Sequence, residues 1–104
     1  MSKYVLAYHG GNMPESPTDQ AAVMVAWGAW FGELGDAVVD GGHPTGQSKT
    51  LASDGSTQDG GGTNPLSGYS LITATDIDSA IILAKGCPIL SAGGSIEVAE
   101  AIEM

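Results

Sequence analysis

The 104-residue chain has no arginine, only three lysines and a single cysteine, against twelve Asp and Glu residues. Its formal charge of −9 repels nucleic-acid phosphates and anionic membrane surfaces, so we expect neither as a partner. The lone Cys87 excludes an intramolecular disulfide and a thiolate metal cluster within one chain. No apolar run reaches the ~20 residues of a membrane span. We therefore expect a cytoplasmic protein.

Apolar residues make up 42% of the sequence and are spread through it, which predicts one folded domain over residues 1–104. The patterns predict strands at 3–9, 37–42, 69–73 and 96–104, and helices at 16–35 and 76–86. This β-α-β-β-α-β order is typical of an α+β, ferredoxin-like sandwich, in which both helices cover one face of a four-stranded antiparallel sheet.

Helical spacing of apolar residues marks the face of each predicted helix that should be buried. In the first helix this face is predicted to hold Val23, Trp27, Trp30 and Leu34, and in the second Ile77, Ala80, Ile81 and Ala84. Aromatic residues at such spacing are typical of a core, so we expect the two tryptophans to pack there rather than stack on a cofactor.

The segment 45–65 is dominated by Gly, Ser, Thr, Asp and Asn. Its Asp54-Gly55 pair predicts a small hairpin between residues 49–53 and 56–59. In a compact domain, so long an excursion is a lid, a binding element or simply a mobile loop.

The uncovered face of the predicted sheet would carry residues of the last strand, where Ile96, Val98, Ile102 and Met104 alternate with Glu97, Ala99, Ala101 and Glu103. An exposed apolar face predicts a partner. The most economical partner is a second copy of the chain in a two-fold homodimer.

Several segments together resemble the YCII-related (DGPF-type) family: residues 68–72, the helix from Asp76 to Gly86, Cys87-Pro88, and Gly93 to Val98. Asp59-Gly60-Gly61-Gly62 stands where that family often has Asp-Gly-Pro-Phe. The resemblance covers most of the chain. It implies a dimeric α/β barrel, in which two ferredoxin-like sheets pack face to face.

Some catalytic members of that family use a histidine early in the first helix and an aspartate near its end as an acid-base pair. An approximate alignment places Met24 and Glu33 at these positions, so the helix histidine is absent. The resemblance therefore leaves open whether this chain is an enzyme.

The predicted topology brings His9 and His43, each at the end of a strand, to one edge of the sheet about 10 Å apart, or two strand spacings. Asp59 and Tyr69 should lie nearby, and Asp40 is a further candidate for the pocket. Imidazole, carboxylate and phenol groups are suited to proton transfer with a small organic substrate. The alternative is that both histidines are polar residues flanking loops.

Two other kinds of site are disfavoured. A metal held by His9, His43 and Asp59 or Asp40 would have plausible ligands, but their spacing matches no metal motif. Residues 41–50 imitate a phosphate-binding loop, but Gln47 stands at the lysine position and Pro44 lacks an N–H. We expect no cofactor.

Two function classes follow. The first is a small homodimer that binds or transforms a small organic molecule by cofactor-free acid-base chemistry of the lyase or isomerase type. The second is a noncatalytic dimerisation or protein-interaction module, in which the acidic surface or the 45–65 segment binds another protein.

Overall fold

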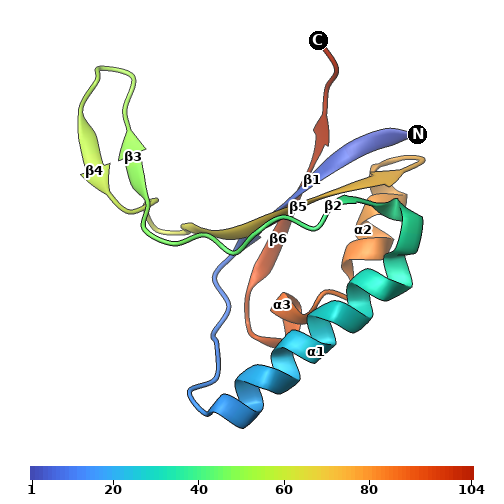
Figure 1. The fold of residues 1–104 in the computed structure, drawn as a ribbon. Coiled ribbons are helices and arrows are strands. Elements are labelled where there is room, and N and C mark those ends of the chain that lie inside the picture. The colour runs from blue at the N-terminus through green and yellow to red at the C-terminus, as the bar shows by residue number, and fades with distance from the viewer.

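A four-stranded antiparallel sheet forms the centre of the protein, described by a computed structural model of residues 1–104 (Figure 1). Its strands are β1 (Ser2–His9), β2 (Val38–Asp40), β5 (Leu66–Ala74) and β6 (Ser95–Ala101). Their order is β2-β5-β1-β6, so β5 separates β1 from β2 by two strand spacings, as the predicted placement of His9 and His43 requires. The α+β architecture is compatible with a ferredoxin-like fold.

Three helices lie on one face of this sheet: α1 (Pro17–Leu34), α2 (Ile77–Ala84) and the single turn α3 (Pro88–Ser91) (Figure 1). Ser16 Oγ caps α1 by accepting the Asp19 N–H at 3.1 Å, and an Asp76 carboxylate oxygen caps α2 from the Ser79 N–H at 2.8 Å. Both helix starts confirm the sequence prediction, whereas α3 was not anticipated. None of the helices is both long enough and apolar enough to cross a bilayer.

The core lies between the sheet and the helices. Leu6 and Ile72 are fully buried there, and Trp30 donates its indole N–H to the Leu83 carbonyl oxygen at 3.0 Å. Trp27 meets Tyr8 edge-on, with ring centroids 5.2 Å apart. The prediction that both tryptophans belong to the core is therefore confirmed.

Two predictions about burial are wrong. Ile77 and Ile81 are 45% and 40% exposed, because α2 approaches the sheet through the small side chains of Ala80 and Ala84. In β6, Ile96 packs with Val98 against the helix-side core, so these two side chains do not belong to the uncovered face.

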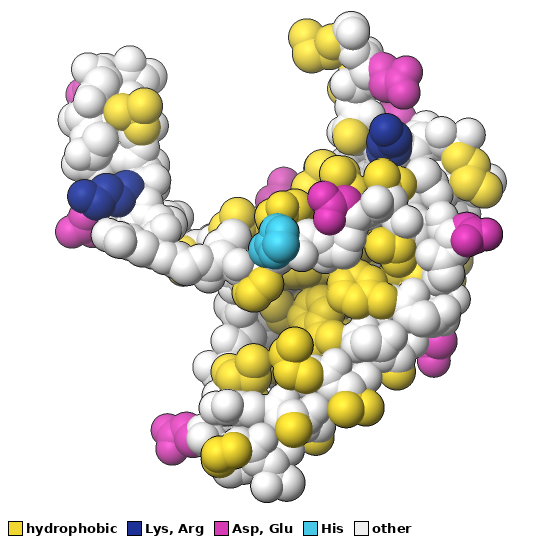
Figure 2. Space-filling view, in the orientation of Figure 1, with side chains coloured by type: hydrophobic (Ala, Val, Ile, Leu, Met, Phe, Trp, Pro, Cys, Tyr) yellow, Lys and Arg dark blue, Asp and Glu magenta, His cyan; other side chains and the backbone are white.

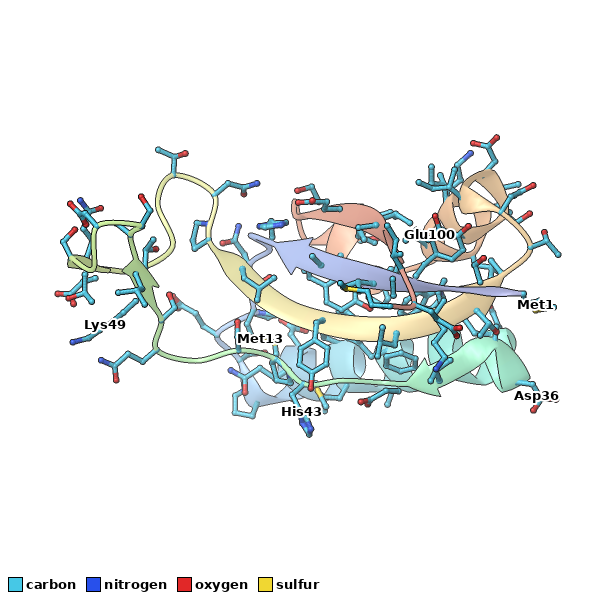
Figure 3. The ribbon with its side chains drawn as sticks, turned by 90° about the horizontal axis from the view of Figure 1, so that it is seen from above. Met1, Met13, Asp36, His43, Lys49 and Glu100 are labelled. Atoms are coloured by element: carbon cyan, nitrogen blue, oxygen red, sulfur yellow. The ribbon has the colours of Figure 1, made fainter.

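The face of the sheet opposite the helices is called the open face. Strand register places Val5 opposite Leu71 on β5 and Ala99 on β6, and Ala7 opposite Tyr69 on β5. No element of the chain lies on this face, as seen edge-on in Figure 1 and from above in Figure 3. An apolar sheet face is therefore left without cover.

A separate hairpin, called the arm and comprising residues 48–60, projects from the sheet. Its strands β3 (Lys49–Leu51) and β4 (Thr57–Asp59) pair only with each other, which confirms the predicted hairpin. The turn uses Gly55 at a φ of +89°. The arm rises on the open-face side of the sheet (Figure 1). Because it projects, the radius of gyration is 14.9 Å, above the about 13 Å expected of a compact chain of this length.

Candidate functional site

His9 is the best-positioned chemical group on the open face. It ends β1 at a register irregularity, and its side chain is only 16% exposed. Its Nδ1 lies 2.9 Å from the Asn64 carbonyl oxygen. Because a carbonyl oxygen can only accept, Nδ1 carries the proton of the neutral ring, and the lone pair is on Nε2.

Glu97 faces that lone pair, with its Oε1 3.7 Å from His9 Nε2. Strand register explains the proximity. Glu97 on β6 lies opposite Ala7 on β1, so it is a diagonal neighbour of His9. The Glu97 carboxylate is 71% exposed. Nε2 is the nitrogen of the neutral ring that can accept a proton, and the Glu97 carboxylate lies close enough to pair with Nε2 when it holds one.

Glu97 was not among the residues predicted from the sequence. The alternation in the last strand signalled a face shared by Glu97 and Ala99, but it did not show that this face also holds His9. Only the β1–β6 register supplies that fact.

Ser67 adds an unused polar group beside this pair. It follows Leu66, the residue opposite His9, and belongs to the same alternation as Tyr69 and Leu71 on the open face. Its Oγ is buried and has no hydrogen-bond partner within the chain. A buried hydroxyl without a partner is uncommon, and it is a polar group of the open face that the fold itself leaves unpaired.

His43 lies beyond β2, at the edge of the sheet opposite to β6, which carries Glu97. Its carbonyl oxygen accepts the Tyr69 N–H at 3.2 Å, and the two rings meet with centroids 6.2 Å apart. Figure 3 shows the His43 ring projecting outward from the β2 edge. The structure therefore brings together the predicted residues His43 and Tyr69, while His9 has other partners.

Gly42 permits the close approach that positions His43. Its φ is +73°, and a Cβ at this position would clash with the Tyr69 carbonyl oxygen. Only glycine fits both constraints.

The two predicted aspartates take separate roles. Asp40 Oδ1 accepts the Gly42 N–H at 2.8 Å, which makes a local turn beside His43. Asp59 lies on the arm, where its 96% exposed side chain is 3.8 Å from Lys49 Nζ. Asp59 is not brought to either histidine. No cluster of three His, Cys, Asp or Glu side chains is placed to hold a metal ion.

Polar groups on the helix side serve the fold. Tyr8 donates its hydroxyl to Ser70 Oγ at 2.7 Å, and Ser70 donates to the Gly41 carbonyl oxygen at 2.7 Å. Burial raises the pKa of the Tyr8 phenol, and it raises the pKa of the Cys87 thiol to about 11. Both groups are therefore neutral near pH 7, so Cys87 is not a nucleophile there.

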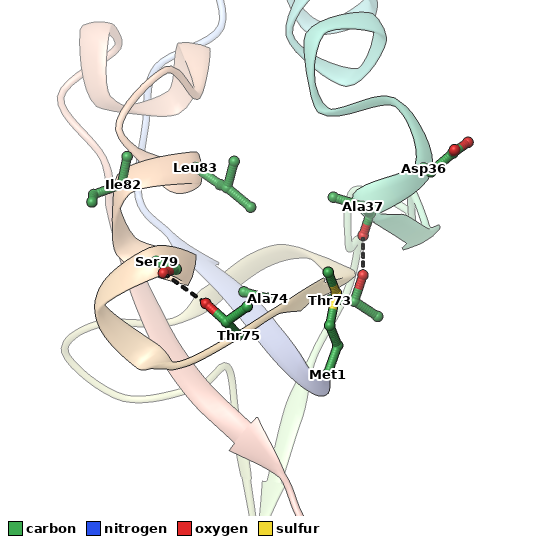
Figure 4. A pocket seen from close by; sticks show the side chains of 9 residues that line it. All are labelled: Met1, Asp36, Ala37, Thr73, Ala74, Thr75, Ser79, Ile82 and Leu83. Carbon is green, nitrogen blue, oxygen red and sulfur yellow. Dashed lines mark hydrogen bonds between the residues drawn. The ribbon is translucent and has the colours of Figure 1, made fainter.

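A hollow of about 460 Å³ lies at the far end of the sheet, between α2 and the end of α1 (Figure 4). Ala37, Ala74 and Leu83 supply much of its apolar surface. Thr73 Oγ1 is bonded to the Ala37 carbonyl oxygen at 3.5 Å, and Thr75 to Ser79 at 3.0 Å. Because these hydroxyls already have partners, the hollow lacks the convergent free polar groups of a specific site.

No family model matches this chain, and no curated protein matches its sequence. The resemblance to the YCII-related family therefore stays a prediction. What the chain does has to be inferred from the His9–Glu97 pair, the open face and the arm.

Proposed function

We propose that the chain functions as a homodimer, joined through its open face, that binds a small organic molecule beside His9 and exchanges a proton with it through cofactor-free chemistry. The observation that carries the proposal is the orientation of His9. Asn64 fixes its Nδ1–H, which leaves Nε2 as the proton acceptor next to the Glu97 carboxylate.

The composition of the open face supports the homodimer. Val5, Leu71 and Ala99 lie side by side in three adjacent strands, with no helix over them. Two such faces related by a two-fold axis would pack as in a β-sandwich. This is the arrangement that the resemblance to dimeric α/β barrels implies.

Dimerisation would also change the chemistry of the His9–Glu97 pair. Glu97 is largely exposed in one copy, so water screens its interaction with His9. A second sheet over the open face would exclude much of this water and strengthen the attraction between imidazolium and carboxylate. The net charge of −9 favours neutral or cationic ligands over polyanions.

A thermal-shift screen of metabolites tests the proposal, because a native-state ligand raises the melting temperature by mass action. The screen uses the wild type, His9→Gln and the matched control His43→Gln. We expect at least one compound to stabilise the wild type and the control but not His9→Gln. A ligand that still binds His9→Gln and is lost in His43→Gln would refute the assignment to His9.

The projecting arm favours a second candidate, a noncatalytic module that binds another protein. Residues 49–59 are all exposed, as expected of a surface that awaits a partner. This alternative predicts no stabilising metabolite and a bound protein that is lost when the arm is deleted. Retention of every bound protein by the arm-deleted chain would remove its support.

A further inference from the structure

We infer that the arm of each copy extends past the dimer interface and holds the second copy along the side of its sheet. This inference rests on the homodimer proposed above and adds to it an interaction surface and its occupant. The occupant is a second copy of this chain, and the surface is the arm together with the open face.

Nothing in its own chain covers the arm, whose residues 49–59 are all exposed. A two-stranded hairpin alone is marginally stable in water, yet this one is locally well made. Thr50 Oγ1 donates to the Gly60 carbonyl oxygen at 2.7 Å, and the Gly60 N–H donates to the Ser48 carbonyl oxygen at 2.9 Å. Asp54 Oδ1 accepts both the N–H and the hydroxyl of Ser56. A hairpin that has a defined shape but does not pack against the rest of its chain is suited to contact another molecule.

The arm is long enough to reach a second copy. Its extended part, from Lys49 to the turn that begins at Ala52, spans about 13 Å, whereas two packed sheets lie about 10 Å apart. The arm rises on the open-face side, so it points toward a second copy packed on that face (Figure 1). An arm slightly longer than the spacing between two packed sheets reaches the level of the second sheet, so its turn lies beside the sheet of the second copy.

The open face is small. Four strands about 4.8 Å apart and at most about seven residues long have a flat footprint of roughly 450 Å². A stable interface takes about 800 Å² from each partner. The open face is thus a small platform for a stable dimer, and the arm is the exposed element on the same side that adds to the contact area.

The shape of the molecule fits the same occupant. The arm rises at one end of the open face, and the C-terminal segment after β6 rises on the same side (Figures 1 and 2). Ile102 and Met104 in this segment are 78% and 117% exposed, and Leu51 on the arm is 71% exposed. A second copy seated between these two projections would cover apolar side chains at both ends of the open face.

Sedimentation equilibrium tests the inference on the full chain and on a variant in which Asn-Gly replaces residues 49–59. This deletion removes no core residue. Ser48 and Gly60 already lie together at the base of the arm, so a two-residue turn can join them. We expect the deletion to raise the dimer Kd at least about tenfold while the near-ultraviolet circular dichroism of the tryptophans stays unchanged. An unchanged Kd would overturn the inference and leave the homodimer intact, whereas a full chain that is monomeric at every concentration would overturn both.

Point variants keep the test decisive if the deletion fails to fold. Leu51→Asp places a charge on the arm and should raise the Kd several-fold, whereas Met24→Asp, on the exposed side of α1, should not change it. A spin label on Ser53→Cys supplies a direct readout, because the native Cys87 is buried. The label should lose mobility in the dimer. A label equally mobile in concentrated and dilute solution would contradict the inference.

Discussion

The two faces of the central sheet are built from the same strands, but only one of them is covered. On β1, Leu6 is fully buried under the helices, while its neighbour Val5 is partly exposed on the open face. Both are apolar, as are Leu71 and Ile72 on β5. Strands that are apolar on both sides are typical of sheets covered on both sides. The open face combines apolar Val5 and Leu71 with the charged Glu97, and the proposed homodimer would cover its apolar part.

The largest expected effect comes from truncating neighbouring residues that face opposite sides. Ile72→Ala should lower the free energy of unfolding by about 2–5 kcal/mol, because it leaves a cavity in a close-packed core. Leu71→Ala should cost less than about 1 kcal/mol in dilute, monomeric protein, because water reaches this site before and after the change. Urea denaturation below the dimer Kd measures both. Equal losses would show that the two faces do not differ as described.

A charge on the open face should separate the roles of the two faces further. Leu71→Asp should raise the dimer Kd about 100-fold, because dimerisation would bury an unpaired carboxylate. Val25→Asp on the exposed side of α1 is the control, since Val25 is 72% exposed and lies on the helix layer. Sedimentation measures both variants. A dimer that tolerates Leu71→Asp would place the interface elsewhere.

The contrast between the faces also shows what sequence patterns can establish. The helix caps, the Asp54-Gly55 hairpin and the strand order were all predictable, because each depends on local turn chemistry or on a topology rule. The burial of Ile77 was mispredicted for a different reason. Periodicity identifies an apolar stripe, but the small Ala80 and Ala84 determine which part of α2 approaches the sheet.

The candidate site was predictable only in part. His9 was selected because it ends a strand, but its partners come from distant segments. Asn64 lies in the long segment before β5, and Glu97 reaches His9 through the register of β6. The predicted grouping of His9 with His43 and Asp59 assumed that the ends of strands converge. The structure instead turns His43 outward and carries Asp59 away on the arm.

A smaller effect should come from the hydrogen bonds of the covered face. Tyr8→Phe removes the hydroxyl that donates to Ser70 but leaves the Ser70 bond to Gly41, so we expect a loss of about 1 kcal/mol in stability. Ser70→Ala and the double variant complete a mutant cycle in urea denaturation. Strictly additive losses would mean that the two hydroxyls are not coupled.

A last expected effect is a pH dependence confined to the covered face. An unfolded chain releases the Cys87 proton near the ordinary thiol pKa of 9.0, whereas burial raises the native pKa to about 11. Between these values the unfolded state binds fewer protons than the native state, so stability falls as pH rises. The buried Tyr8 phenol, whose pKa is also raised, adds to this loss above about pH 10. The melting temperature of Cys87→Ala should therefore fall less than that of the wild type between pH 8 and pH 10, and parallel curves would show that the thiol does not carry the effect.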